Sequence, residues 1–232
     1  PKNNIKNINQ AFIDCDIEIE RFISRTFALG VELLNKNELE FGSIIIDLGF
    51  EKISLGLFKN LALIHSITLP IGINHIAKDI SKVCSLSLEE SESIRNSFDF
   101  SFQDNNNLFD ENNNLKKDFF IKSNFRKISK NLILNVIKAR VDEIFNLLKK
   151  QLIVPEFNLQ SSLGMLFVGH GSKLVNLQKY SKNFFGLNVK VNENNLEKNF
   201  NSCIGALKII KDGWETEALP ELGNQSVVKT GF

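Results

Sequence analysis

Residues 44–49 read Ile-Ile-Ile-Asp-Leu-Gly, and this short stretch decides how the chain folds. Three branched apolar residues in a row predict a buried strand, and the glycine two positions after Asp47 predicts a turn that another group can approach closely. Such an aspartate can hold a metal-bound water while the turn faces phosphate oxygens. Asp and Gly also form ordinary turns for conformational reasons alone, so both interpretations of Asp47 and Gly49 stay open.

The segments around this strand predict an α/β fold with the order β-β-β-α-β-α. Each strand candidate is a short apolar run bounded by turn residues, and each helix candidate has apolar residues three or four apart. Pro70 and Gly72 separate the third strand from the first of these helices. The predicted strands after residue 49 are 53–58, 61–69, 165–168 and 189–191, and the predicted helices are 74–84, 174–185 and 201–210.

The rest of the chain adds three helical patterns and one irregular segment. Residues 7–34 have apolar side chains at helical spacing, and residues 35–37 (Asn-Lys-Asn) supply a break. A helix over 87–97 begins with a serine that can cap it and has two glutamates in its first turn. Residues 126–152 show the strongest helical pattern in the chain, with apolar residues advancing four at a time. Residues 99–118, rich in Asn, Asp and Phe, predict a mobile loop or an irregular hairpin.

The overall composition excludes several classes of protein. The 232 residues are enough to bury a full core, and no apolar run approaches the roughly 20 residues that a membrane-spanning helix needs. A net charge of +1 provides no field to concentrate a polyanion, so we expect no nucleic-acid partner. Three widely separated cysteines suggest neither a disulfide framework nor a metal site and fit a reducing compartment.

A second candidate site lies at residues 167–174, which read Phe-Val-Gly-His-Gly-Ser-Lys-Leu. A strand leads here through a glycine turn into a helix, whose unpaired N–H groups suit a phosphate or the sugar and base of a nucleotide. Gly169, Gly171 and Ser172 are therefore candidate binding residues. His170 has no carboxylate or nucleophile at motif distance, so we interpret it as a turn residue.

Glu92 and Arg95 form the third candidate, because residues three apart share one face of a helix. A surface ion pair is the ordinary interpretation of such a pair. Beside a cleft, the same two side chains could instead bond ribose hydroxyls and bracket an adenine. The order of the three candidates along the chain favours the second interpretation.

That order resembles the C-terminal lobe of the actin-like superfamily and, within it, the FtsA family of bacterial cell-division proteins. The resemblance runs from about residue 7 to residue 210, which is nearly the whole chain. Residues 47–49 look like the second phosphate motif of the family, and residues 169–172 look like its adenosine motif. The further matching segments are 70–74 with 79–80, 91–95, 136–140 with Glu143, and 202–207.

The resemblance implies an actin-like, ribonuclease H-like lobe that binds ATP and Mg²⁺ against a first lobe, with Asp47 at the metal. It also implies self-association into filaments and binding of the C-terminal peptide of FtsZ, for which Arg140 and Glu143 are candidate contacts. The expected location is the cytoplasm, peripheral to the inner membrane at the division site, with attachment through an amphipathic helix outside this chain. The implied nucleotide-binding residues are Asp47, Gly49, Gly72, Glu92, Arg95, Gly169, Gly171 and Ser172.

The resemblance also predicts the domain organisation. We expect little or no ATPase activity from this chain, because the glycine-rich first phosphate loop would precede its first residue. An inserted α+β subdomain would carry the FtsZ-peptide site. The predicted parts are 1–41 as the tail end of the first lobe, 42–80 and 151–211 as the second-lobe core and wall of the nucleotide cleft, 81–150 as the inserted outer subdomain, and 212–232 as a flexible tail.

Departures from the family pattern leave rival functions open. Residues 50–52 (Phe-Glu-Lys) replace a small turn, so bulk and a carboxylate crowd the place meant for phosphate. Ile73 and His170 each replace a usual glycine. These substitutions allow a nucleotide-free, degenerate actin-like scaffold that acts through protein contacts alone. A second rival is an actin-like sugar or acetate kinase lobe, for which no acceptor-substrate motif or catalytic aspartate is identifiable.

Overall fold

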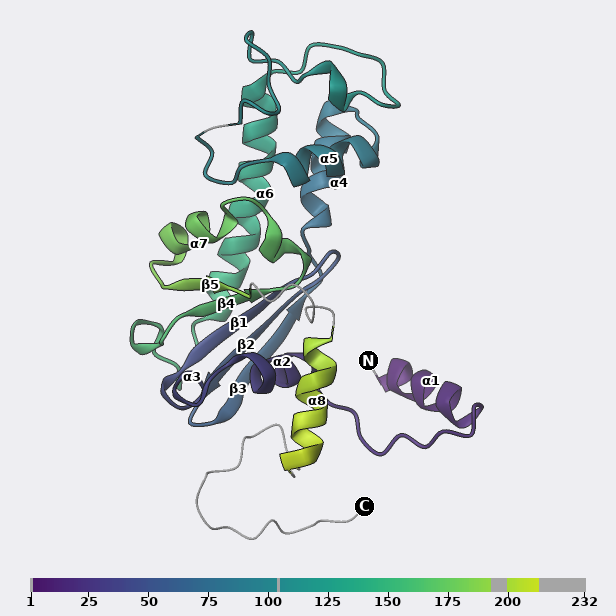
Figure 1. Cartoon of the computed structure of the whole chain (residues 1–232), viewed down its shortest axis with the longest axis vertical. Coiled ribbons are helices and arrows are strands. Elements are labelled where there is room, and N and C mark those ends of the chain that lie inside the picture. Colours follow the sequence, from purple (N-terminus) through teal and green to yellow (C-terminus); the bar gives the residue numbers. More distant parts are fainter. Residues whose placement is uncertain (1, 104, 193–199, 213–232) are drawn as a thin grey trace.

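The centre of the molecule is a five-stranded mixed sheet with the strand order β3-β2-β1-β4-β5 (Figure 1). The computed structural model describes residues 2–103, 105–192 and 200–212. β1 pairs antiparallel with β2 and parallel with β4; β2 pairs antiparallel with β3, and β4 pairs parallel with β5. The predicted strands are confirmed, with the bounds Ser43–Leu48 for β1, Ile53–Lys59 for β2, Ala62–Leu69 for β3, Met165–Val168 for β4 and Val189–Val191 for β5.

Successive side chains of β1 point to opposite faces of the sheet, and helices cover both faces. Ile44, Ile46 and Leu48 pack into one apolar cluster, whereas Ile45 packs into the other. Because both faces are buried, the strand is an uninterrupted apolar run rather than an alternating one. The first face is covered by α6 (Lys130–Gln151) and α7 (Leu177–Phe185), and the second by α2 (Arg25–Leu33) and α8 (Asn201–Asp212) (Figure 1).

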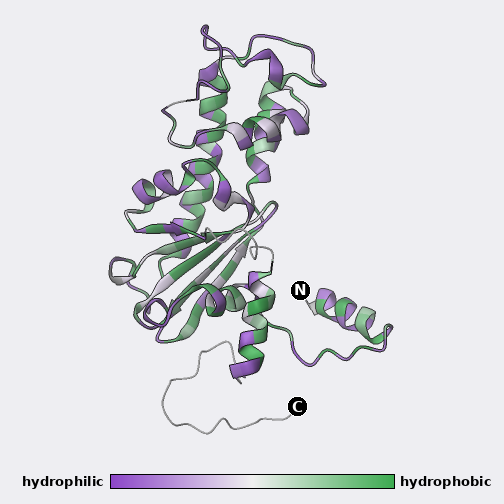
Figure 2. Ribbon diagram, in the orientation of Figure 1, coloured by the Kyte–Doolittle hydropathy of each residue, from purple (hydrophilic) through white to green (hydrophobic). Residues whose placement is uncertain are grey.

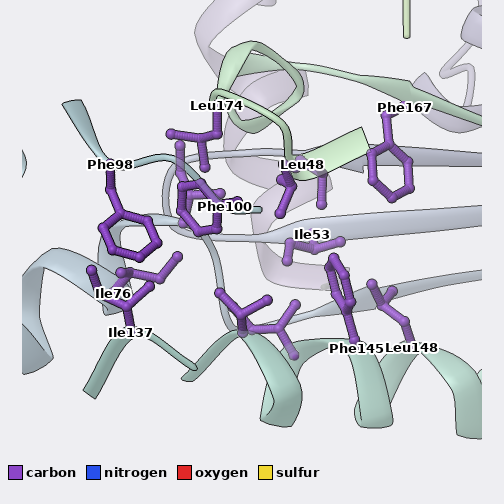
Figure 3. Packing of buried hydrophobic residues seen from close by; sticks show 14 of the residues in the cluster. Leu48, Ile53, Ile76, Phe98, Phe100, Ile137, Phe145, Leu148, Phe167 and Leu174 are labelled. Carbon is purple, nitrogen blue, oxygen red and sulfur yellow. The ribbon is translucent and has the colours of Figure 1, made fainter. Parts of the chain in front are cut away.

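Figure 3 shows the larger of these two clusters from close by. Phe145 and Leu148 of α6 lie against the sheet, and the ring centres of Phe145 and Phe167 are 6.5 Å apart. The same cluster continues to Phe98 and Phe100, which are fully buried. Burying a phenylalanine side chain contributes about 1.5–3 kcal/mol, so this cluster ties the sheet firmly to the helices above it.

The amino-terminal helical pattern forms two helices rather than one. α1 spans Lys2–Ile13, α2 begins at Arg25, and a segment without helix lies between them. Asp16 has a left-handed φ of 57°, which ends the helical run. α1 lies away from the sheet (Figure 1), and hydrophobic and hydrophilic residues alternate along it (Figure 2). The prediction of one helical stretch over 7–34 is wrong, because helical spacing does not show where a helix is interrupted.

α6 and α7 begin later than the residue spacing predicts. The Ser129 side chain accepts a hydrogen bond from the Leu132 amide, and this cap starts α6 at Lys130 rather than at residue 126. A 3₁₀ turn, η3 (His170–Lys173), precedes α7. The remaining helical elements are α3 (Lys36–Phe41), α4 (Asn74–Cys84), α5 (Leu88–Ser97), η1 (Lys117–Phe119) and η2 (Leu159–Ser161).

The segment between α5 and α6 is irregular but well packed. Phe109 and Leu115 form an isolated antiparallel bridge, which confirms the predicted irregular hairpin. Leu108 and Leu115 are fully buried and join the larger apolar cluster. The Asn105 side chain accepts a hydrogen bond of 2.7 Å from the Asp99 amide, which holds the start of the segment. The segment therefore contributes to the core although its sequence is poor in branched apolar residues.

α4, α5 and the first half of α6 stand together above the sheet in Figure 1. The Arg140 guanidinium on α6 pairs with Asp79 on α4, with 2.5 Å between Nε and Oδ2, and ties two of these helices together. The proposed division at residues 81 and 150 stays a prediction, and the predicted tail lies outside the described residues from residue 213 onward. None of the described helices is long and apolar enough to cross a membrane.

A buried glutamate anchors α5 to the segment before α6. The Glu90 carboxylate accepts hydrogen bonds from the amides of Ser87 (2.7 Å), Lys122 (2.6 Å) and Ser123 (2.8 Å) and from the Ser123 hydroxyl (2.6 Å). Burial by itself raises the pKa of a carboxyl group, but these four bonds outweigh it and hold the pKa of Glu90 well below its ordinary value of 4.5. Glu90 is therefore ionised inside the protein.

Replacing Glu90 with alanine should destabilise the protein by about 3 kcal/mol, because buried amide donors lose their acceptor. Glu89→Ala is the matched control: it removes the neighbouring glutamate, whose ion pair with Lys122 is exposed and contributes at most about 1 kcal/mol. Chemical denaturation followed by circular dichroism measures both losses. An equal loss in the two variants would contradict the anchoring role of Glu90.

The same carboxylate should make the stability of the protein depend on acid pH. Because the folded pKa of Glu90 lies below its unfolded value, its contribution is fully present above about pH 4.5 and is lost as the pH falls through the folded pKa. The variant Glu90→Gln lacks this contribution. The difference in unfolding free energy between wild type and Glu90→Gln should therefore shrink below about pH 4.5, and denaturation at a series of pH values tests this. A difference that grows in acid would overturn it.

Candidate functional site

Two turns that are far apart in sequence meet at one edge of the sheet. β1 and β4 are parallel, and Asp47 is the register partner of Val168, so the turns that follow the two strands lie side by side. Gly169 has a left-handed φ of 83°, and a Cβ placed on it would be 2.3 Å from Oδ1 of Asp47. The two glycine turns quoted from the sequence are therefore brought together, and only a glycine fits at their junction.

A third turn, at residues 70–73, packs against the first. The Ile73 amide donates to the Gly49 carbonyl at 3.1 Å, and a Cβ on Gly72 would lie 2.2 Å from the carbonyl oxygen of Phe50. A Cβ on Gly171 would lie 2.6 Å from Cγ2 of Ile73, so the Gly171 turn closes on the same group. Close packing against backbone at Gly72 and against side chains at Gly171 therefore accounts for these glycines before any ligand is considered.

A pocket of about 210 Å³ opens beside the Gly169 turn. It lies where the start of α2, the end of β4 and the start of α8 meet. Arg25, His170 and Lys173 give its lining a basic character, and no acidic residue is among the described residues that line it. The other lining residues are Leu29, Val168, Gly169, Ser172, Asn192 and Asn201.

Ser172 lines this pocket but uses its hydroxyl inside the turn. Its Oγ donates to the Gly169 carbonyl at 2.7 Å, and its amide donates to the same carbonyl at 3.2 Å. Ser172 is buried, whereas His170 and Lys173 are exposed toward solvent. The Ser172 side chain therefore holds the shape of η3, while the side chains of His170 and Lys173 remain exposed and can face a ligand.

The Asp47 carboxylate is already paired with a cation from the protein itself. Nε of Arg25 donates to Oδ2 of Asp47 at 2.8 Å, so a guanidinium already occupies one of the two oxygens that could face a metal ion or its bound water. In the described part of the chain, no group of three or more His, Cys, Asp or Glu side chains could hold a metal ion. A Mg²⁺ ion at Asp47 would have to compete with the Arg25 guanidinium, so the described residues fit this ion poorly, and the metal role of Asp47 stays a prediction.

Glu92 and Arg95 lie on α5, outside the lining of this pocket. Arg95 is only 4% exposed, so the ordinary interpretation of a surface ion pair is wrong for it. Its guanidinium carbon is 5.7 Å from the centre of the Phe50 ring, and Nε and Nη2 donate to Oδ1 of Asn96. Burial lowers the pKa of Arg95, while the charge of Glu92 raises it. Arg95 thus packs from α5 against the ring of Phe50.

The bulky turn at residues 50–52 is held by α4. The Glu51 carboxylate accepts hydrogen bonds from Nδ2 of Asn74 at 2.7 Å and from Nζ of Lys78 at 3.0 Å. These bonds lower the pKa of Glu51, so it stays ionised. The added carboxylate therefore has partners within the protein, which explains how the turn accommodates it.

Arg140 and Glu143 lie on α6, away from the pocket. Arg140 donates to Asp79 and, at 2.6 Å, to Oε2 of Glu143, and its side chain is 22% exposed. Arg140 thus has an internal structural role, whereas the Glu143 side chain is 53% exposed and accessible to another molecule. Their predicted role in partner binding stays a prediction.

Sequence reasoning missed Arg25, Lys173 and the two asparagines at positions 192 and 201 as pocket residues. Arg25 precedes Asp47 by 22 residues, and no local motif connects the two. Lys173 stands inside the quoted glycine turn, so its charge was the one available signal. The asparagines are brought to the pocket by β5 and α8, which only the packing of the sheet could reveal.

Comparison with known proteins places this geometry in a family. The family described as "Cell division protein FtsA" matches residues 44–206, which is more than half of the chain. FtsA of Helicobacter pylori (strain 26695) is 27% identical over 103 residues, covering 44% of this chain and 21% of that protein. FtsA of Enterococcus hirae is 24% identical over 191 residues, covering 82% of this chain and 42% of that protein. The chain thus spans less than half the length of these relatives.

Solved structures show the same fold. MreB5 of Spiroplasma citri bound to ADP superimposes with a TM-score of 0.66 at 19% identity, covering 91% of this chain and 66% of that chain. The MamK double helical filament gives a TM-score of 0.54 at 16% identity, covering 81% of this chain and 58% of that chain. These neighbours confirm the predicted actin-like α/β fold.

The family match covers residues 44–206, and the strand order and the adjacent glycine turns agree with the fold of the structural neighbours. The chain belongs to the FtsA family of cell-division proteins, and its fold is actin-like.

Proposed function

We propose that this chain forms one wall of an adenine-nucleotide site and that a second lobe supplies the opposite wall. The single observation that carries the proposal is the junction of the Asp47 turn with the Gly169 turn beside a basic pocket. Helix starts and glycine turns at strand ends are suited to phosphate groups. A structural neighbour described as bound to ADP supports the choice of an adenine nucleotide.

The proposed cellular role is to link the FtsZ ring to the inner membrane during cell division. The outer part, residues 81–150, would bind the C-terminal peptide of FtsZ. Glu143 is the better candidate contact because its side chain is 53% exposed, whereas that of Arg140 is 22% exposed. Self-association into filaments is supported by the neighbour described as the MamK double helical filament. Membrane attachment would come from a segment outside the described residues, and the protein would work at the cytoplasmic face of the membrane.

We expect little or no ATPase activity from this chain. A single wall cannot surround the triphosphate, and within the described residues the pocket lining offers no carboxylate that could act as a general base. Hydrolysis, if the whole protein performs it, would depend on groups that the opposite wall supplies. Micromolar ATP binding by this chain alone, measured by calorimetry, would contradict the idea of a half-site.

A nucleotide-free scaffold is the second candidate function, and the packing of the glycines favours it. Gly49, Gly72 and Gly171 each make room for protein atoms, so they need no ligand to explain them. The Phe50 side chain, which is 43% exposed, also adds bulk beside the site. In this candidate the fold acts through protein contacts alone. ATP titration of the full-length gene product separates the two functions.

Gly169→Ala in the full-length gene product should weaken ATP binding at least about tenfold, because the added Cβ collides with Asp47 at the junction of the two turns. Gly186→Ala is the matched control. It also has a left-handed φ, 68°, where an alanine costs about 1 kcal/mol, but its Cβ meets nothing within 4 Å. The Gly169 backbone, with φ 83° and ψ −176°, is the more restrictive of the two for an alanine. Calorimetry with ATP measures both variants. Equal ATP affinity in wild type and both variants would count against a nucleotide at this junction.

Glu143→Ala should weaken binding of the FtsZ C-terminal peptide about fivefold, which corresponds to roughly 1 kcal/mol for one exposed charged contact. Glu156→Ala, which removes an exposed glutamate from a turn outside the outer part, should leave peptide binding unchanged. Fluorescence anisotropy of a labelled peptide measures both affinities. A peptide that does not bind, or that loses equal affinity in both variants, would rule out the proposed contact.

A further inference from the structure

The pocket beside the Gly169 turn has the electrostatic character of an anion site. Arg25 and Lys173 line it from two different elements, α2 and η3, and His170 adds a third nitrogen group. Among the described residues of its lining there is no acidic side chain to offset them. The Asp47 carboxylate, which lies next to the lining residue Arg25, already has that arginine as its partner. An anion entering the pocket therefore meets cationic side chains.

Arg25 is placed to bind Asp47 and a ligand at the same time. Only Nε donates to Asp47, and within the described part of the chain no hydrogen bond is made by its two terminal nitrogens. The Asp47 side chain is 11% exposed and the Arg25 side chain 59% exposed, so the guanidinium stands between the buried carboxylate and the open pocket. The planar guanidinium has five donors in a fixed fork, which suits the oxygens of a phosphate group.

This ion pair also explains why a metal ion fits poorly. Mg²⁺ usually bridges protein carboxylates and substrate phosphates, and here the guanidinium of Arg25 already supplies the positive charge between Asp47 and the pocket. A divalent cation at Asp47 would have to displace Arg25 or stand next to it against charge repulsion. The Arg25 side chain thus supplies the positive charge next to Asp47 that a metal ion would otherwise bring.

We infer that this pocket binds the polyphosphate group of a nucleotide directly through Arg25 and Lys173, without a divalent metal ion. The inference rests on the proposed nucleotide function and specifies its chemistry. A volume of about 210 Å³ is smaller than the roughly 300 Å³ or more of pockets that enclose a drug-sized ligand, so this chain by itself encloses only part of a nucleotide. The cationic side chains of Arg25 and Lys173 in its lining favour the phosphates as that part.

Calorimetry on the full-length gene product tests the inference with two probes, ATP and inorganic pyrophosphate, each in excess EDTA and in excess MgCl₂. The expected dissociation constants in EDTA lie within about twofold of those in MgCl₂. Binding that appears only with MgCl₂ would overturn the inference and leave the nucleotide function standing. Binding of pyrophosphate but not ATP in EDTA would keep the metal-free site and reject the nucleotide function. Failure of both probes in both buffers would reject both.

Variants of the ion pair make the test specific. Arg25→Ala should lose at least about tenfold in ATP affinity in EDTA, and MgCl₂ should restore part of it, because Asp47 then becomes free to hold the metal. Adding Asp47→Asn to Arg25→Ala should abolish that restoration. Arg21→Ala, an exposed arginine four positions earlier that does not line the pocket, is the charge-matched control and should bind like wild type. An Arg25→Ala protein that melts normally and binds ATP in EDTA like wild type would refute the inference.

Discussion

The parallel pairing of β1 with β4 is the constraint on which the rest of the structure depends. With Asp47 beside Val168 in the register, the turns after both strands end at the same edge of the sheet, and the pocket forms next to them. This register pairs Ile44, Ile45 and Ile46 of β1 with the apolar residues 165–167 of β4, and β1 is buried on both faces. The geometry of the site is therefore a consequence of core packing.

The turns at that edge lie so close together that packing alone requires their glycines. Side chains on Gly72, Gly169 or Gly171 would collide with backbone or with neighbouring side chains. Glycines that look like a ligand signature are thus needed by the fold itself, and their presence does not distinguish a working nucleotide site from a scaffold. The charges around the pocket are more informative, because Arg25 and Lys173 are not required to close any turn.

The outer part is joined to this edge by a continuous core. α6 carries Leu148 against the sheet and Ile133 among the helices above it, and both belong to one apolar cluster. The pairing of Arg140 with Asp79 ties α6 to α4 at the border of the outer part. The Glu90 carboxylate fastens α5 to the segment before α6. A partner that binds the outer part and a nucleotide at the sheet edge would therefore act on one packed unit.

The sequence by itself determined the β-β-β-α-β-α order, the Asp47 and Gly169 turns and the family, because apolar periodicity, turn residues and motif order are all local patterns. Only the tertiary structure decided that Arg25 neutralises Asp47, that Arg95 is buried behind Phe50, and that Lys173 lines the same pocket as Arg25. It also decided that α1 and α2 are separate helices. The physical reason is that ion pairs and pocket linings join residues from different elements, and their spacing in the chain leaves no periodic trace.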